Sequence, residues 1–525
     1  MIERIHRFVT DIGRRIEDIE IRFHEAYWRS QIEASEANDS ARAELELQLR
    51  ELKGDPVALE KINAALAEEI HDPLLRRQLE VLRLSFTANQ MNEQVRQEIV
   101  SLSTQIESDF SSFRAQVGDR RLSDNEIDDV LKHSDDVDER KDVWQASKQV
   151  GGAVADRVRE LVRLRNATAR ELGYADYYQM SLELQELEEP WLFDVMQRLE
   201  KVTDEPFEAW KNDLDERLRE RFSTTDLYPW HYADPFFQSL PPDGRVTLDD
   251  ALGGLSAEEL AIETFARWDI DLRDVMGNSD LYPRERKCQH AFCLDVDRKG
   301  DVRILANVVP SERWIETMLH ESGHAAYDIC IDKHLPYLLR RPCHIFVTEA
   351  IALLSGRMTR DPVWLKDIAG VAANEVDALA DDLRAANAAQ SLQFARWGLV
   401  MVHFERDLYA DPEADLDDLW WRHVEHFQRV KVPREEAPEG AWAAKIHIAA
   451  APVYYQNYLL GDLLASQLAT TARERFGGIV GSAEAGHLLK EKVFTPGNSA
   501  TWREVIVGAT DHDLDPGHLA AELTR

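Results

Sequence analysis

The sequence predicts a mainly α-helical protein with one small β-hairpin, and three observations indicate this fold class. First, helical periodicity dominates residues 1–220, in charged amphipathic segments such as ARAELELQLRELK. Second, glycine and proline near residues 54–56, 151–152 and 189–190 predict breaks that divide this region into separate helices. Third, convincing strand alternation is confined to residues 290–306. With 525 residues, 44% of them hydrophobic, the chain can bury a large core.

Residues 290–306 have the pattern of an antiparallel hairpin. Side chains alternate in polarity from His290 to Val296, Gly300 lies in a charged turn, and the alternation resumes at Val302. The exposed edge of such a hairpin can pair with an extended peptide. A small sheet with a purely structural role explains the pattern equally well.

The segment after the hairpin carries the strongest chemical signal. Ser311 predicts a helix N-cap, and the apolar spacing that follows predicts a helix over Trp314–Ala326. Residues 320–324 of this helix read HESGH. His320 and His324 lie on one helix face, so both imidazoles can bind a single Zn²⁺. Glu321 is placed to take a proton from a zinc-bound water, as in zinc hydrolases.

A solvated helix that happens to carry two histidines is the alternative interpretation. The apolar residues Ile315, Met318, Leu319 and Ala326 indicate instead a helix that is at least half buried. Gly323 costs about 1 kcal/mol relative to alanine inside a helix, which indicates that another element packs closely there. Both features favour a metal centre.

A catalytic zinc ion needs a third protein ligand and one open coordination position. Tyr327 and Cys330 stand where the metzincin class has glycine and histidine, which excludes that class. The remaining candidates downstream are Asp328, Asp332, His334, His344 and Glu349. Glu349 is preferred because it opens a second apolar helix, which Thr348 would cap and which would pack on the first. Asp328, one turn beyond the second histidine, is expected to orient a ligand.

Charge and composition exclude several classes of partner. The formal net charge is −35, from 97 acidic and 62 basic residues, which argues against binding to nucleic acid or anionic membranes. Attraction of cationic peptides is possible, but solubility explains the charge more simply. No stretch approaches the roughly 20 apolar residues of a membrane span, and the N-terminal segment does not resemble a signal peptide. The four cysteines lack CxxC spacing and are explained as buried thiols, so a cytoplasmic location is expected.

A second group of polar residues lies far downstream, in a segment of small and apolar side chains. It consists of Lys445, His447, Tyr454, Tyr455 and Tyr458. Tyrosine and histidine donors stabilise the oxyanion of peptide hydrolysis, and a lysine can hold a substrate carboxylate. Tyrosines at helical spacing are more often core residues, so this segment alone is a weak signal.

Together, the two segments resemble the peptidyl-dipeptidase A family, whose known member is angiotensin-converting enzyme, and more distantly the thimet oligopeptidase family. The HExxH of residues 320–324 and Glu349 match the zinc ligands of that family at nearly the same spacing. Its Ala-Lys-x-His-Ile segment appears at 444–448, and its following Tyr-x-x-Tyr appears at 455–458, one residue further on. The resemblance is specific over about 288–349 and 443–460.

This resemblance implies roles for individual residues. Glu321 would be the general base and later the acid, and Tyr458 with His447 would stabilise the oxyanion. Lys445 and Tyr455 would hold the C-terminal carboxylate of a peptide. The pair His290-Ala291 would line the substrate cleft, with the histidine holding the substrate backbone.

The resemblance also implies a fold, a helical ellipsoid with a deep central cleft and the zinc helix on its floor. The expected organisation is a single peptidase unit over 1–525. Within it, 1–225 form a mostly helical wall and lid, and 226–525 form the catalytic half with the zinc site and the C-terminal tyrosine and histidine segment.

Four departures from the family pattern stand out. Asn307 replaces the second cysteine of a disulfide around the hairpin, so that bond cannot form, in agreement with a reducing compartment. Asn457 replaces an arginine that helps to bind chloride, so the resemblance does not support chloride activation. Leu353 replaces an acidic residue four positions after the zinc glutamate. The carboxylate-binding glutamine of the family has no obvious counterpart, and Tyr232 lies near its expected position.

The sequence therefore predicts a zinc-dependent peptidase with one Zn²⁺ per chain that releases C-terminal dipeptides from short peptides. The nearest alternative is an endo-acting oligopeptidase of the thimet type, in which Lys445 does not anchor a terminus. A catalytically inactive peptide-binding protein is an alternative from another class, but it would be expected to lose Glu321, a zinc ligand or the tyrosines. Natural substrates and oligomeric state are left open.

Overall fold

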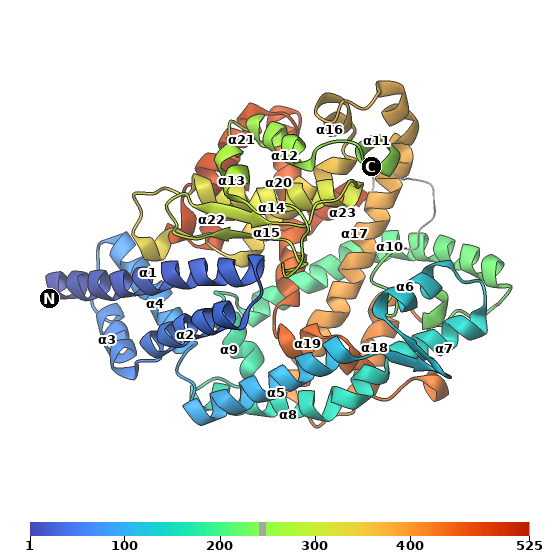
Figure 1. The fold of residues 1–525 in the computed structure, drawn as a ribbon, viewed down its shortest axis with the longest axis horizontal. Coiled ribbons are helices and arrows are strands. Elements are labelled where there is room, and N and C mark those ends of the chain that lie inside the picture. The colour runs from blue at the N-terminus through green and yellow to red at the C-terminus, as the bar shows by residue number, and fades with distance from the viewer. Residues whose placement is uncertain (241–247, 524–525) are drawn as a thin grey trace. The chain divides into compact units, whose positions relative to one another are not determined.

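A computed structural model describes residues 1–240 and 248–523 of the chain. Helices dominate these residues, and their strands form two small antiparallel hairpins (Figure 1). The predicted mainly α fold with a small hairpin is confirmed. None of the described helices is long and apolar enough to cross a membrane.

The contacts of the chain divide it into two compact units, each assembled from segments far apart in the sequence. The first unit comprises Met1–Gln90, Thr247–Leu383 and Leu460–His518, and the second comprises Met91–Val246, Arg384–Leu459 and Leu519–Arg525. Three helices contribute residues to both units: α17 (Ala373–Ala410), α20 (Tyr455–Phe476) and α23 (Gly517–Leu523). The predicted single peptidase unit with its halves 1–225 and 226–525 stays a prediction.

The first unit contains the hairpin and the helix with the HExxH sequence. Its elements are α1 (Ile2–Ile32), α2 (Glu36–Lys53), α3 (Pro56–Leu66), α4 (Pro73–Thr87), α11 (Asp249–Leu252), α12 (Ala257–Ala266), α13 (Arg273–Asn278), β3 (Phe292–Asp295), β4 (Val302–Leu305), α14 (Glu312–Cys330), α15 (Ile345–Gly356), α16 (Pro362–Asp367), α21 (Ala483–Leu489) and α22 (Trp502–Thr510). Figure 1 shows the hairpin beside α14, which also packs along α15.

The second unit is helical apart from one hairpin. Its elements are α5 (Glu93–Ser112), β1 (Ala115–Val117), β2 (Arg120–Leu122), α6 (Asp124–His133), α7 (Val137–Ser147), α8 (Gln149–Glu171), α9 (Tyr177–Leu184), α10 (Glu189–Phe222), α18 (Leu416–His423) and α19 (His447–Ala450). The hairpin of β1 and β2 was not predicted, because strands of three residues are too short to show an alternating pattern.

Local sequence explains where many helices begin. Asp55 and Asp72 accept backbone N–H groups in the first turns of α3 and α4, and a proline occupies the first turn of each. The predicted break at 189–190 is confirmed as the start of α10. The break predicted near 151–152 lies at Lys148, between α7 and α8, and both glycines lie inside α8. There, the missing Cβ of Gly151 admits close backbone approach, since an ideal Cβ would lie 2.7 Å from the backbone N of Ala444.

The predicted hairpin is confirmed as β3 and β4, with Cys293 opposite Ile304 and Asp295 opposite Val302. The turn is closed by side chains as well as backbone. Asp297 accepts the N–H groups of residues 299 and 301, at 2.7 and 3.1 Å. Gly300 has a φ of 130°, a conformation that other residues rarely adopt.

Candidate functional site

Helix α14 carries three of the predicted site residues. As predicted, Ser311 caps it, accepting the N–H of Trp314 at 3.3 Å. The ring centroids of His320 and His324 are 5.1 Å apart on one face of the helix. Glu321 lies between them in sequence and is 7% exposed.

Helix α15 brings Glu349 to the two histidines. The prediction that Thr348 caps this helix was wrong, because α15 begins earlier and the side chain of His344 accepts the N–H of Phe346 at 3.1 Å. Thr348 lies in the first turn, with its Oγ1 2.8 Å from Nδ1 of His324. If Nε2 of that histidine binds a metal, Nδ1 carries the proton and donates it to this hydroxyl.

Glycines allow the helices around Glu349 to approach closely. An ideal Cβ on Gly323 of α14 would lie 2.8 Å from Cα of Ala352 and 2.9 Å from the carbonyl oxygen of Ile351, both in α15. The close packing predicted at this glycine is thereby confirmed. An ideal Cβ on Gly461 of α20 would lie 3.3 Å from Cβ of Glu349. Two neighbouring helices therefore constrain the position of the carboxylate.

The three side chains form a compact set of metal-binding atoms. Oε2 of Glu349 lies 3.1 Å from Nε2 of His324 and 3.6 Å from Nε2 of His320. All three atoms lie within 4.8 Å of one another, and among the described residues no other group of His, Cys, Asp or Glu is close enough to hold a metal ion. Two imidazoles and a carboxylate fit the donor set of a catalytic zinc ion with an open fourth position. Their role as ligands stays a prediction.

Burial and mutual charge set the protonation of these groups. Burial lowers the pKa of His320 to about 4, and His324 acts in the same direction. Burial also lowers the pKa of His324, but the hydrogen bond and negative charge of Glu349 outweigh it and raise that pKa. Burial raises the pKa of Glu321 to about 7, against a backbone hydrogen bond from Cys293. That N–H belongs to β3, so the hairpin orients the proposed base.

His290 and Ala291 lie directly before β3, in the bend that leads into the hairpin. The histidine is exposed and the alanine is half-buried. This position leaves both accessible beside the strand, and their contact with substrate stays a prediction.

Lys445 of the second unit has a partner that the sequence did not reveal. Its Nζ donates a hydrogen bond to Oε1 of Gln238 at 2.7 Å. Tyr232, six residues earlier, is 2% exposed and its hydroxyl binds Lys211 and Asp215. Gln238 therefore lies beside the lysine, and Tyr232 does not. No sequence motif identifies Gln238 as a functional residue. Its one distinguishing feature in the sequence is that it follows two phenylalanines.

Three rings cluster near this pair in the same unit. The ring of Tyr455 lies 5.3 Å from that of His447 and 5.5 Å from that of Tyr458, centroid to centroid. Nε1 of Trp397 donates to the hydroxyl oxygen of Tyr455 at 2.8 Å, which leaves the hydroxyl proton available to a ligand. Burial, followed by the charge of Lys445, lowers the pKa of His447 to about 4, so its imidazole is neutral.

The asparagines that depart from the family pattern have structural partners. Nδ2 of Asn457 donates to Oε1 of Gln185 at 2.9 Å. Nδ2 of Asn307 donates to the carbonyl oxygen of Cys288 at 2.9 Å. All four cysteines are free thiols, and Cys343 is buried while the other three are half-buried rather than fully buried as predicted.

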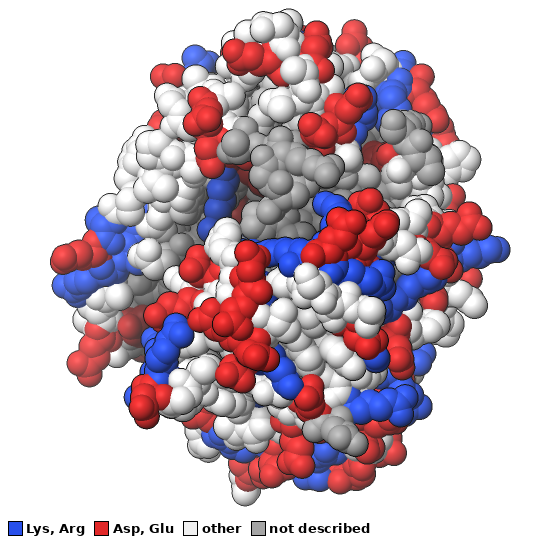
Figure 2. Space-filling view, turned by 90° about the vertical axis from the view of Figure 1, so that its right-hand side faces the viewer, with Lys and Arg blue, Asp and Glu red and all other residues white. Residues whose placement is uncertain are grey.

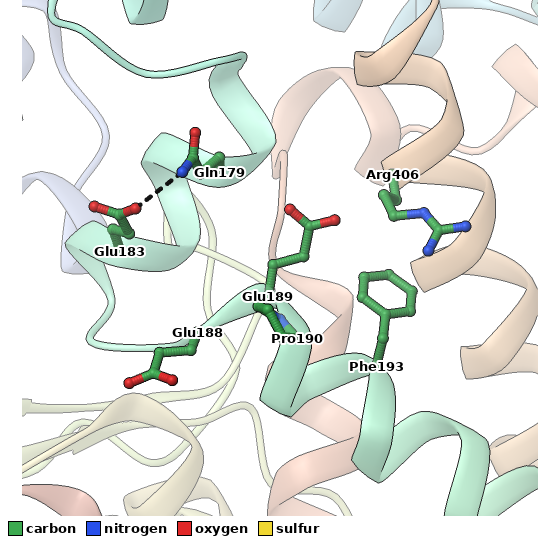
Figure 3. A pocket seen from close by; sticks show the side chains of 7 residues that line it. All are labelled: Gln179, Glu183, Glu188, Glu189, Pro190, Phe193 and Arg406. Carbon is green, nitrogen blue, oxygen red and sulfur yellow. Dashed lines mark hydrogen bonds between the residues drawn. The ribbon is translucent and has the colours of Figure 1, made fainter.

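A separate cavity of about 540 Å³ lies in the second unit (Figure 3). Its lining consists of Gln179, Glu183, Glu188, Glu189, Pro190, Phe193 and Arg406. The guanidinium of Arg406 lies 4.3 Å from the ring centroid of Phe193, so the aromatic face is already covered by a cation. None of the predicted site residues is among these seven. On the face shown in Figure 2, acidic side chains are spread among basic ones.

Comparison with families of known proteins gives two matches. The model of peptidase family M3 matches residues 130–523, which include the segments 320–349 and 445–458. The model described as angiotensin-converting enzyme matches residues 2–210. Both expected resemblances are confirmed, and the longer match is to the family expected to be more distant. The search of curated proteins finds no match.

Proposed function

Because this chain belongs to peptidase family M3, whose members are zinc metallopeptidases that act on peptides, we propose that it releases dipeptides from the C-termini of short peptides. The observation that carries this proposal is the hydrogen-bonded pair of Lys445 and Gln238, together with Tyr455, since Trp397 contacts both Lys445 and Tyr455. An ammonium, an amide and a hydroxyl in one unit supply the donors that a terminal carboxylate requires. We further propose that short peptides are its partners and that it acts in the cytoplasm.

The proposed chemistry is hydrolysis at a zinc centre. Zinc held by His320, His324 and Glu349 would supply a Lewis acid to polarise the scissile carbonyl group. Glu321 takes a proton from the attacking water and returns it to the leaving amine. Its carboxyl group suits both steps, because a pKa of about 7 allows it to accept and release a proton at neutral pH.

The aromatic cluster of the second unit stabilises the developing negative charge in this proposal. The hydroxyl of Tyr458 and the neutral imidazole of His447 are hydrogen-bond donors for the oxyanion. The burial that keeps the imidazole neutral also removes competing water, which strengthens such a hydrogen bond.

An endo-acting oligopeptidase is the second candidate, and the extent of the family M3 match favours it. In that function the same zinc centre cleaves within the peptide, and Lys445 contacts no terminus. A catalytically inactive binding protein is less well supported, because the HExxH glutamate, the three predicted ligands and the tyrosines are all present.

The deciding experiment is mass spectrometry of products from one unstructured nonapeptide, supplied with a free or an amidated C-terminus. We expect loss of dipeptides from the free acid alone, abolished by a chelator and restored by zinc. Equal internal cleavage of both peptides would replace the proposal with the oligopeptidase function. Absence of cleavage by zinc-loaded protein would favour the binding protein.

A further inference from the structure

The loop that presents Gln238 is folded around one buried carboxylate. Asp234 is 3% exposed, and its Oδ1 accepts the N–H groups of Phe236 at 2.9 Å and Gln238 at 3.2 Å. Its Oδ2 accepts those of Gln238 at 2.9 Å and Ser239 at 2.8 Å. The N–H groups of three residues in the loop therefore donate to this side chain, and the N–H of Gln238 lies within hydrogen-bond distance of both carboxylate oxygens.

The same loop contains strain and is held from outside by buried donors. Phe237, directly before the glutamine, is 4% exposed and has a φ of 50°, in the left-handed region that a bulky residue rarely adopts. Nε2 of Gln428 donates to the carbonyl oxygens of Phe237 at 2.8 Å and Phe236 at 3.1 Å. Nε2 of Gln393 donates to the carbonyl oxygen of Ser239 at 2.9 Å. A loop bound so thoroughly holds its glutamine in one place.

The charge of Asp234 also acts on the lysine of the pair. Burial lowers the pKa of Lys445 to about 8, and the negative charge of Asp234 is the interaction that opposes this. A second lysine, Lys148, is 2% exposed, and its Nζ lies 3.2 Å from the ring centroid of Phe236 in the same loop. The negative charge of Asp234 thus favours the protonated form of both lysines, against the effect of burial on their pKa.

We propose that Asp234 is the positioning residue that makes this enzyme selective for peptides with a free C-terminus. It folds residues 234–239 so that Gln238 stands beside Lys445, ready to receive a carboxylate. The proposal rests on the proposed dipeptide-releasing function, because it concerns the same carboxylate-binding pair.

The test compares the free-acid and amidated forms of one peptide in wild type and Asp234→Asn. The asparagine keeps one acceptor oxygen but loses the charge and the second acceptor. We expect KM for the free acid to rise about ten- to a hundredfold, as for loss of a hydrogen bond to a charged group, with kcat and the amide reaction little changed. Asp361→Asn is the matched control, because Asp361 similarly accepts two backbone N–H groups, at 2.7 and 3.3 Å, at the start of α16.

Two further variants separate a positioning role from a general structural one. If Asp234 acts through Gln238, the double variant with Gln238→Ala loses no more selectivity than the larger single variant. Gln428→Met loosens the same loop from the other side and is expected to reduce selectivity similarly, even if Asp234→Asn does not fold.

Each outcome decides between the proposals. Unchanged selectivity in Asp234→Asn and Gln428→Met overturns the positioning role. The positioning role is also overturned if Asp234→Asn lowers activity equally on both peptides. The same holds if the losses of selectivity from Asp234→Asn and Gln238→Ala are additive. A wild-type enzyme that does not distinguish the two peptides overturns the proposed function, and the positioning role with it.

Discussion

Glu321 lies between the two histidines of the candidate metal centre in sequence, and two features of the fold act on its carboxyl group. Burial raises its pKa, and the backbone N–H of Cys293 orients it. Both depend on residues that the HExxH sequence does not include. At the scale of single residues, the HExxH spacing indicates the proposed base, and its tertiary environment raises the pKa of its carboxyl group.

Glu321→Gln is expected to retain zinc and to lower kcat by about 10²–10⁴-fold, because glutamine cannot accept the proton. Zinc content by atomic absorption and single-substrate kinetics measure the two effects. Glu312→Gln makes the same change at the start of α14, where the side chain pairs with Arg360 at 3.1 Å, and should leave kcat unchanged. Undiminished turnover in Glu321→Gln would refute its role as base.

Tyr458→Phe removes the proposed donor to the oxyanion and keeps the ring. We expect kcat to fall about 10²–10³-fold with little change in KM, since the bond strengthens only in the transition state. Steady-state kinetics at saturating zinc give both constants. A change in KM alone would make this tyrosine a substrate-binding residue instead.

The charge of Lys445 predicts a pH dependence of substrate binding. Burial lowers its pKa to about 8, so the ammonium is present below that pH and is lost above it. We expect KM for a free-acid peptide to rise up to about tenfold per pH unit above about 8, and KM for the amide to stay constant. Lys445→Arg stays charged and should abolish the rise. A rise that persists in Lys445→Arg would assign the titration to another group.

At the scale of elements, the contact between α14 and α15 decides whether the predicted ligands can meet. His320 and His324 need only one helix, but Glu349 comes from another, and Gly323 sets how closely the two helices approach. The sequence indicated this packing through the cost of a glycine inside a helix. It did not indicate Gly461, whose close approach to Glu349 depends on a helix over 100 residues downstream.

Gly323→Ala is expected to separate α14 from α15, lowering the free energy of unfolding by about 1–3 kcal/mol and weakening zinc affinity. Denaturant unfolding and competition with a chromogenic chelator measure the two effects. Gly508→Ala is the matched control, since nothing lies within 4 Å of its ideal Cβ in α22, and it should stabilise by about 0.4–1 kcal/mol. Normal zinc affinity in Gly323→Ala would show that the helices can adjust.

At the scale of the whole molecule, the predicted site residues belong to two different units. The candidate metal centre belongs to the first unit, and Lys445, His447, Tyr455 and Tyr458 belong to the second. Each unit is assembled from three segments that are far apart in the chain. Simple periodicity cannot reveal such an assembly, because it describes only near neighbours in the chain.

Removal of the metal is expected to destabilise the first unit, because zinc binds the folded ligand set. At a free zinc concentration of 100 times Kd, the stabilisation is about 2.7 kcal/mol. Thermal unfolding with chelator, and again after zinc is restored, measures it. Glu349→Gln should show no such shift. If the melting temperature of the wild type does not respond to zinc, the assignment of these ligands is wrong.

The sequence by itself determined the helical fold class, the β3–β4 hairpin, the cap of α14 and the choice of candidate ligands. These features depend on periodicity, turn residues and fixed spacing, which are local properties of the chain. Only the tertiary structure decided that Thr348 contacts His324, that Gly151 lies inside a helix, and that Gln238 pairs with Lys445. Such contacts join residues that are distant in sequence. They depend on which backbone segments can pack closely together and on which buried polar groups find hydrogen-bond partners.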